Sequence, residues 1–264
     1  MSMSAVLPGI KKRVFSLSFR RGLTSIIIGL LLWEAGRAVG LPLLHAMPAP
    51  SEILGVMGSL LTEPSFWGNW ASSFNRVLTG FILAQIVGIP LGLAMAASRS
   101  MYGLVFPPFE ILRPIPPLAW VPISIIFWPT TESSITFVIF LGAFYTVVVN
   151  VLGGAKNIDS RYVRAAISLG SRGRDVFFRI VLPATLPSIF TGMAVGMGIT
   201  WEVVVAAEMI AGKSGLGYLT WSSYVGGNYP QIVVGMISIG VAGYISSSAI
   251  RKLGELCMPW RRLF

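Results

Sequence analysis

The sequence predicts an all-α polytopic membrane protein that crosses the bilayer about six times. Of its 264 residues, 54% are hydrophobic and only 11% are charged, and the mean hydropathy is +0.76. A soluble domain usually carries about 25% charged residues, so this chain has too little charge to cover a soluble surface. No stretch between the apolar segments is long enough to build a second core. We therefore expect residues 1–264 to form one transmembrane domain, which begins with a cytoplasmic segment over residues 1–22.

Six segments approach the roughly 20 apolar residues that a helix needs to cross about 30 Å of hydrocarbon. They are Leu23 to Leu41, Val77 to Ala97, Gly103 to Trp128, Ile135 to Leu152, Leu186 to Ile210, and Ile232 to Ile250. The third, which includes Trp120, contains six prolines, and proline removes a backbone donor and kinks a helix. Irregular backbone at membrane depth has to be buried in protein or line a cavity. This segment is therefore the first candidate for the lining of a solute pathway.

Two further patterns concern helix packing. Residues 50–62 carry apolar side chains at helical spacing but are too few to cross a membrane, so we expect an interfacial helix, with a solvated loop as the alternative. Glycines recur four residues apart at Gly88 and Gly92 and again at Gly192 and Gly196. Such spacing allows helices to approach closely. The helices that meet there could belong to this chain or to two subunits.

The net charge of +10 is distributed in clusters between the apolar segments. Most aromatic side chains lie inside or at the ends of those segments, not on a basic solvated face, which argues against a nucleic-acid partner. Lys and Arg are retained in cytoplasmic loops, and most of the 20 fall within residues 11–21, at Arg99, within residues 156–179 and within residues 251–262. This distribution predicts a multi-pass protein with both termini in the cytoplasm.

The longest cytoplasmic connection, residues 153–183, has two amphipathic halves. Val163, Ala166 and Ile167 share one helical face, and a second face follows after the break at Ser168–Ser171. We expect two short helices joined by a glycine turn. Their apolar faces could dock on a partner protein or lie on anionic lipid headgroups, and the physical pattern alone favours neither.

One motif in this connection resembles a known family. Arg164-Ala165-Ala166, three residues, Gly170, nine residues and then Ile180-Val-Leu182-Pro183 resemble the EAA motif in permeases of binding-protein-dependent ATP-binding-cassette importers. Arg164 stands where that motif has glutamate, which leaves the helix-turn-helix shape intact but removes the carboxylate.

Further strings resemble the nitrate, taurine, alkanesulfonate and bicarbonate branch of this family. They are Arg113 to Pro122, Ala165 to Gly170, Ala206 to Ile210 and Gly215 to Tyr218, in this order along the chain. The resemblance implies a type I ABC importer permease fold in the bacterial inner membrane and import of a small anion. It also implies a homodimer with a second permease subunit, and an extracytoplasmic substrate-binding protein. Two ATPase subunits that hold ATP and Mg are implied to dock on the EAA residues Arg164, Ala165, Ala166, Gly170, Ile180, Leu182 and Pro183.

The chain itself is expected to bind no cofactor and no metal. Gly212-Lys213-Ser214 has the end of a phosphate-binding loop, but Ala207 stands where that loop requires glycine. A single cysteine, Cys257, cannot form a cysteine-cluster metal site. ATP hydrolysis is therefore assigned to partner subunits.

Glu34 and Arg37 fall near the outer end of the first predicted crossing, where they can reach the headgroups. Four other ionisable side chains fall at membrane depth, where they usually face a cavity or a partner: Glu110, Arg113, Glu202 and Glu208. With Trp120 they form the predicted translocation pathway. Glu110 and Arg113 are three residues apart and can pair, either to fix the proline-rich bend or to serve a substrate. Arg113 is expected to be the only cation deep in a span, with a fork geometry that suits oxyanions. Glu208 is expected to cap or brace a gate.

Other functions are less consistent with the sequence. A membrane-embedded enzyme would need clustered histidines, paired aspartates or a nucleophile with its base, whereas the chain has one histidine, His45, and only Asp159 and Asp175. An ion-coupled secondary transporter would usually show internal repeats, and none is evident. A related permease for a non-anionic metabolite remains an alternative.

Overall fold

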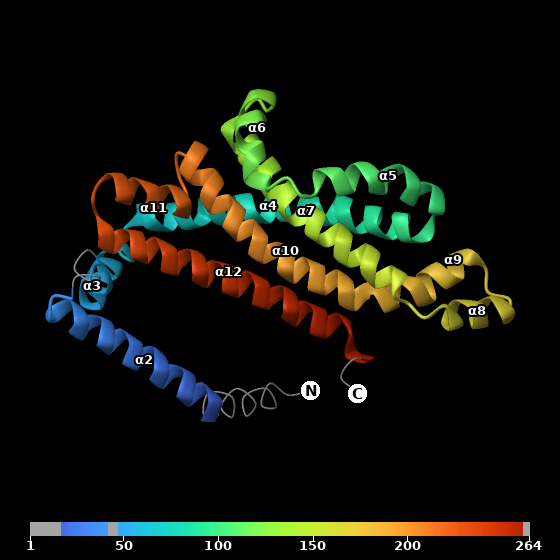
Figure 1. The fold of residues 1–264 in the computed structure, drawn as a ribbon, viewed down its shortest axis with the longest axis horizontal. Coiled ribbons are helices and arrows are strands. Elements are labelled where there is room, and N and C mark those ends of the chain that lie inside the picture. Colours follow the sequence, from blue (N-terminus) through green and yellow to red (C-terminus); the bar gives the residue numbers. More distant parts are fainter. Residues whose placement is uncertain (1–16, 42–46, 261–264) are drawn as a thin grey trace.

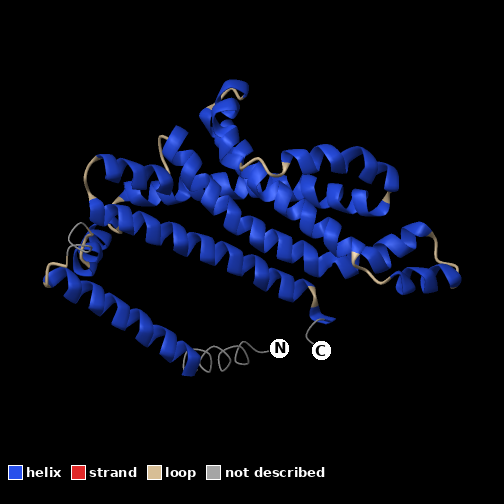
Figure 2. Cartoon of the chain, in the orientation of Figure 1, coloured by secondary structure: helices blue, strands red, loops and turns tan. Residues whose placement is uncertain are grey.

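The computed structural model describes residues 17–41 and 47–260, which are helical almost throughout and contain no strand (Figure 2). This confirms the all-α prediction for the described residues. In chain order the elements are α2 (Leu17–Ala38), α3 (Pro50–Leu60), α4 (Pro64–Ala97), α5 (Arg99–Leu112), the 3₁₀ turn η2 (Pro117–Trp120), α6 (Val121–Phe127), α7 (Thr131–Lys156), α8 (Ser160–Ser168), α9 (Gly173–Val176), the π-helical turn η3 (Phe177–Val181), α10 (Leu182–Ala211), α11 (Leu216–Val225) and α12 (Tyr229–Cys257).

Four helical stretches are long and apolar enough to cross a membrane: Pro64–Ala97, Thr131–Lys156, Gly173–Ala211 and Tyr229–Cys257. The pair Arg99–Leu112 and Pro117–Phe127 counts as one further crossing only as a broken span, because the chain bends by 87° between its halves. The predicted break in the third crossing is thus present. The first predicted crossing falls on α2, a helix of 22 residues that also carries charged side chains, Arg20, Arg21, Glu34 and Arg37.

Helix α7 is the central helix of the bundle and packs along both α4 and α10 (Figure 1). Its side chains at Val138, Ile139, Ala143, Val147, Val148 and Val151 are completely buried. Full burial of one valine or isoleucine side chain contributes roughly 1.5–3 kcal/mol. The α4–α7–α10 contacts therefore form the main core that positions the rest of the molecule.

The spaced glycines lie at these two contacts. A Cβ atom at Gly92 of α4 would be 2.9 Å from Val151 Cβ of α7, and one at Gly192 of α10 would be 2.7 Å from Asn150 Cβ of α7. Both distances are too short for a side chain, so the glycines allow close helix approach. Of the two alternatives that the sequence left open, packing within the chain is the one observed.

Residues 50–60 form a helix, α3, and not a loop; it packs on α12 and buries Ile53 and Leu60. Glu34 of α2 accepts hydrogen bonds from Ser51 of α3, from its backbone N–H at 3.1 Å and from its hydroxyl at 2.8 Å. Figure 1 shows α2 leaving the bundle at this junction. Most of its apolar side chains, such as Leu32, are exposed in the single chain.

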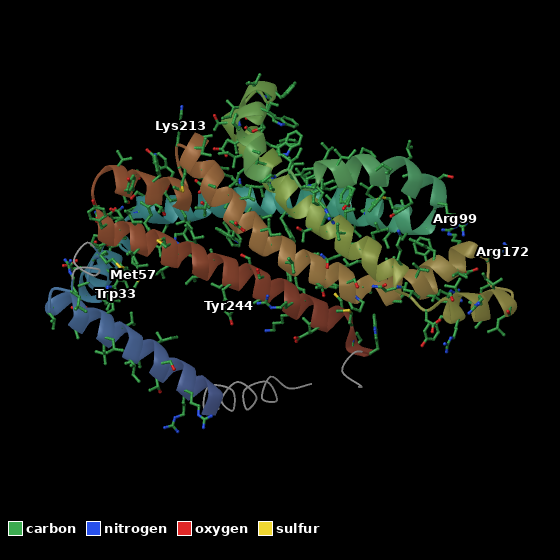
Figure 3. The ribbon with its side chains drawn as sticks, in the orientation of Figure 1. Trp33, Met57, Arg99, Arg172, Lys213 and Tyr244 are labelled. Atoms are coloured by element: carbon green, nitrogen blue, oxygen red, sulfur yellow. The ribbon has the colours of Figure 1, made fainter. Side chains whose placement is uncertain are left out.

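The two ends of the bundle differ in what they carry. Arg99, at the start of α5, and Arg172, just before α9, lie at the end formed by α8 and α9, whereas Lys213 lies toward the opposite end, near α11 (Figure 3). These positions agree with the sequence-based division of basic residues into two groups.

Candidate functional site

Helix α8 projects from the end of the bundle and has no buried side chain. Asp159 begins it by accepting a hydrogen bond from the Arg161 N–H at 2.8 Å, as N-terminal capping residues do. At its other end Gly170 adopts φ +86°, and the Ser171 N–H donates to the Ala166 carbonyl at 3.0 Å. This is a glycine-terminated helix end in which the left-handed conformation is required, so the predicted glycine turn is present.

The second half of this connection differs from the prediction of two separate short helices. α9, the π-helical turn and α10 form one continuous helical stretch of 39 residues, Gly173–Ala211. Phe177 and Leu182 pack against a buried cluster that includes Val147 of α7 and Ile189 of α10. Ile180 and Pro183 are half-buried beside it. α9 is therefore continuous with α10 and is anchored on the core by this packing.

The outer surface of α8 is free and partly apolar. Tyr162, Ile167 and Leu169 are 66%, 58% and 87% exposed. Arg164 and Ala165, the first two positions of the EAA-like motif, are exposed next to them. Such a cluster of exposed apolar side chains on a small projecting element is typical of a surface that contacts a partner protein or a membrane.

Three predicted pathway residues, Glu110, Arg113 and Trp120, lie in the broken third crossing. Arg113 Nη2 lies 3.0 Å from Glu110 Oε1, and the two side chains are 40% and 43% exposed. The predicted ion pair is thus formed, at the bend and not deep in the bundle. Trp120 lines an apolar cavity of about 310 Å³ together with Phe127, Trp128 and Phe137, and its buried Nε1 has no hydrogen-bond partner among the described residues.

The most extensive polar network joins α4, α7, α10 and the start of α11. Arg76 of α4 donates to Glu132 of α7 through Nε at 2.7 Å and through Nη2, and its Nη1 donates to Glu208 Oε1 of α10 at 2.7 Å. It also donates to the carbonyl and the hydroxyl of Ser214, at 2.7 and 3.1 Å. Five hydrogen bonds match the five N–H groups of a guanidinium. We call Ser73, Arg76, Glu132, Glu208 and Ser214 the Arg76 cluster.

Glu208 is completely buried and accepts a hydrogen bond from the first turn of α11. Its Oε2 accepts from the Gly217 N–H at 2.9 Å, and Ser73, which donates to the same carboxylate, accepts from the Leu216 N–H at 2.8 Å. Asn69 of α4 accepts from the Gly215 N–H at 2.8 Å. Free N–H groups at a helix start favour such acceptors and a negative charge. Glu208 thus caps α11 and holds it against α4 and α10.

The glycines of the Gly215-Leu216-Gly217 string are required by this geometry. Gly215 has φ +116°, and a Cβ atom there would collide with the Glu208 carboxylate. A Cβ atom at Gly217 would collide with the backbone carbonyl of Val205. The string therefore allows a loop to pack directly on a buried carboxylate.

Comparison with known proteins identifies the family. Residues 88–253 match the family model described as binding-protein-dependent transport system inner membrane component. This match covers more than half of the chain. The chain belongs to this permease family.

Individual relatives agree with the assignment. The permease is 40% identical over 205 residues to an ABC transporter permease protein of Methanocaldococcus jannaschii, covering 77% of each chain. It is 32% identical over 258 residues to the nitrate import permease protein NrtB of Synechocystis sp., covering 93% of this chain and 92% of NrtB. It is 32% identical over 219 residues to the taurine transport system permease protein TauC of Escherichia coli, covering 81% and 80%.

The fold of the permease also matches a solved structure. A chain from crystals of the MetNI methionine ABC transporter in inward-facing conformations superposes with a TM-score of 0.64 at 17% sequence identity. The match covers 74% of this chain and 98% of that chain. At this identity the likeness establishes the ABC importer permease fold and nothing about the solute.

One sequence-based expectation about the permease was wrong. Arg113 is not the only cation within a span, because α4 begins at Pro64 and places Arg76 in the helix interior, where its side chain is 4% exposed. The apolar segment that starts at Val77 leaves Arg76 just outside the predicted crossing. A signal was available: Asn69, Ser73 and Arg76 follow the i, i+4, i+7 spacing of one helical face.

Proposed function

We propose that this permease subunit pairs with a second copy and that the two subunits form the translocation pathway of an ATP-driven importer. Two separate ATPase subunits, which hold ATP and Mg, supply the energy, and an extracytoplasmic binding protein delivers the solute. The chain is one transmembrane domain with both termini, residues 1–22 and the connection 153–183 on the cytoplasmic side. Family membership and the basic residues gathered at the α8–α9 end support this arrangement.

The surface of α8 and the Gly170 turn is the dock for an ATPase subunit. The single observation that carries this proposal is that α8 exposes Tyr162, Ile167 and Leu169 without burying any side chain. The EAA-like residues Arg164, Ala165, Ala166, Gly170, Ile180, Leu182 and Pro183 belong to this element or to the helix that leaves it. Because that helix continues into α10, force applied at the dock reaches the membrane-spanning part of the subunit.

The solute is a small anion of the kind named for the relatives, such as nitrate or a sulfonate, or bicarbonate as in the same branch. Glu110, Arg113, Trp120 and Glu202 are the pathway residues that we propose. Glu208, which the sequence also predicted for the pathway, is completely buried and braces α4, α10 and α11 instead. Arg113 lies at the break of the third crossing, where irregular backbone has to line a cavity or be buried. Its fork of donors suits two oxygens of one oxyanion, although Glu110 shares it.

A charge placed on the dock tests the proposal. Leu169→Asp adds a carboxylate to an 87% exposed side chain, so the isolated subunit should fold normally but fail to copurify with its ATPase subunit. Val225→Asp is the matched control, because Val225 is 70% exposed at the end of α11, far from α8 (Figure 1). Normal ATPase copurification and transport with Leu169→Asp would show that α8 is not the dock.

A further inference from the structure

An open groove runs between α10 and α12 on the half of the bundle that carries α8 and α9 (Figure 1). It holds about 760 Å³, within the range of roughly 300–1,000 Å³ that is usual for small-molecule sites. Its floor on α10 is mainly apolar and includes Phe190, Ala194 and Val195. The charged side chains of its lining, Arg251 and Glu255, both belong to α12. The groove is therefore an apolar surface with one cation and one anion along a single wall.

Glycine contacts fix the register of the two helices. A Cβ atom at Gly254 of α12 would be 2.9 Å from Phe190 Cγ of α10. A Cβ atom at Gly243 would be 3.6 Å from Trp201 Cγ. The two glycines and the two aromatic residues are each eleven positions apart, so the helices run antiparallel and keep one register over this stretch. Arg251 precedes Gly254 by three residues and therefore lies about 4.5 Å nearer to the Trp201 end of the groove.

Arg251 lies where the apolar part of α12 ends. The 19 residues from Ile232 to Ile250 carry no charge. They extend roughly 28 Å at 1.5 Å per residue, close to the hydrocarbon thickness of about 30 Å. Glu255 follows Arg251 by four residues, on the same helical face and further from the apolar run. The two charged groups therefore lie at the level of the lipid headgroups, and the groove leads from them toward the centre of the membrane.

The side chains around these charges indicate contact with lipid. Leu253 and Leu256 are exposed beside them on α12, and Trp260 is exposed just beyond the helix. Tryptophan is enriched at membrane–water interfaces. Exposed apolar side chains gathered in this way mark a surface that contacts a membrane or a partner, whereas a water-filled route would be lined by polar side chains.

An apolar chain that enters the groove has a continuous surface to follow. The groove ends at Gly198 of α10, one turn before Glu202. By the register of the two helices, Tyr244 and Val241 of α12 lie beyond that level, and both are exposed. A chain that leaves the groove there can follow α12 without reaching the carboxylate of Glu202.

Arg251 and Glu255 are both available to a ligand. Arg251 Nη2 donates to the neutral Ser248 hydroxyl at 2.8 Å, and Glu255 makes no hydrogen bond or ion pair with any described residue. A phosphate group is a strong acceptor for a guanidinium, whereas Glu255 favours a headgroup that also carries an ammonium group. In phosphatidylethanolamine the ammonium group lies beyond the phosphate as seen from the acyl chains. Glu255 likewise lies beyond Arg251 as seen from the membrane centre, so the order of charges in the lipid matches the order along α12.

We propose that the α10–α12 groove binds one phospholipid whose headgroup carries an ammonium group, such as phosphatidylethanolamine. The phosphate interacts with Arg251 and the ammonium group with Glu255. One acyl chain packs on Ala194, Val195 and Gly198. This lipid site goes beyond the proposed function and depends neither on the solute nor on the ATPase dock.

Lipid retention by the assembled, purified transporter tests the two charges. The complex is delipidated and incubated with equal amounts of phosphatidylethanolamine, phosphatidylglycerol and phosphatidylcholine, and the retained lipids are measured by mass spectrometry. Phosphatidylethanolamine should be retained about three- to tenfold over the other two, because phosphatidylglycerol has no ammonium group and the nitrogen of phosphatidylcholine has no N–H. Glu255→Gln should remove this preference, and Arg251→Gln should lower the retention of all three lipids.

Lys252→Gln is the matched control for the charges. Lys252 is exposed next to Arg251 but does not line the groove, so its loss should leave lipid retention unchanged. Equal retention of the three lipids by the unaltered complex would overturn the proposal. So would the same loss with Lys252→Gln as with Arg251→Gln, because the lipid would then bind to a diffuse basic surface.

A side chain placed in the groove tests the acyl-chain site. Gly198→Phe should lower phosphatidylethanolamine retention as far as Arg251→Gln does, since a Cβ atom at Gly198 has no neighbour within 4 Å and the ring can extend into the groove. Gly240→Phe on α12 is the matched control, because Gly240 is equally open but does not line the groove. Unchanged retention with Gly198→Phe would overturn the proposal. If that variant also separated the paired permease subunits, the groove would be a contact between two copies of the chain.

Discussion

Arg76 and Glu208 form a charge pair that an apolar helix bundle can tolerate because their hydrogen bonds are satisfied. All five guanidinium N–H groups have acceptors, and both carboxylate oxygens of Glu208 have donors. Removal of one member of such a pair leaves the other as an uncompensated buried charge, which costs about 3–5 kcal/mol. The cluster is therefore expected to hold α4, α7, α10 and α11 in one arrangement.

We expect Arg76→Met to lower the unfolding temperature of the purified subunit strongly, because Glu208 would be left buried without its cation. Arg76→Lys should be intermediate, since an ammonium group has three donors in place of five. The double variant Arg76→Met with Glu208→Gln should regain much of the loss, since it removes both charges. Thermal unfolding in detergent measures all three. If the double variant lost as much unfolding temperature as the two single substitutions together, Arg76 and Glu208 would not be energetically coupled.

At the level of helices, the sequence predicted apolar lengths better than helix ends. Hydropathy located four of the six predicted crossings on helices long and apolar enough to span a membrane. The prolines located the break, because both signals depend on local composition. Hydropathy did not predict that α4 starts at Pro64, because residues 64–76 include the polar side chains Asn69 and Arg76. Their hydrogen-bond partners are Gly215 for Asn69 and Glu132, Glu208 and Ser214 for Arg76, which come from distant parts of the chain. The sequence predicted that Glu208 caps or braces a gate, but it could not predict the partners of Glu208 on α4, which come from more than 130 positions away in the chain.

The close approach of α4 and α7 depends on Gly92. We expect Gly92→Leu to destabilise the subunit by about 1–3 kcal/mol, the usual cost of overpacking, because the new side chain would overlap Val151. Gly68→Leu is the matched control on the same helix, where a Cβ atom has no neighbour within 4 Å. Its unfolding temperature should be unchanged or slightly raised, since leucine favours helix more than glycine does. Equal losses in both variants would show that the α4–α7 contact does not require a glycine.

For the whole molecule, the distribution of basic residues predicted which loops lie at the same end of the bundle. The enrichment of Lys and Arg in cytoplasmic loops is a property of the loop sequences and needs no tertiary information. The groove between α10 and α12 could not be predicted in this way. Its lining joins residues about 60 positions apart, such as Val195 and Arg251, and depends on the register of two long helices.

Orientation in the membrane follows from the same bias and can be measured on residues at the two ends. In a Cys257→Ser background, Lys213→Cys should react with a membrane-impermeant maleimide in intact cells, whereas Arg172→Cys should react only after the membrane is permeabilised. Both positions are exposed and lie at opposite ends of the bundle (Figure 3), and both substitutions remove one positive charge, so each serves as the control for the other. The physical reason is that basic residues, including Arg172 and its neighbours at the α8–α9 end, are retained on the cytoplasmic side. Labelling of Arg172→Cys in intact cells would reverse the orientation and would place the proposed ATPase dock on the side where no ATP is available.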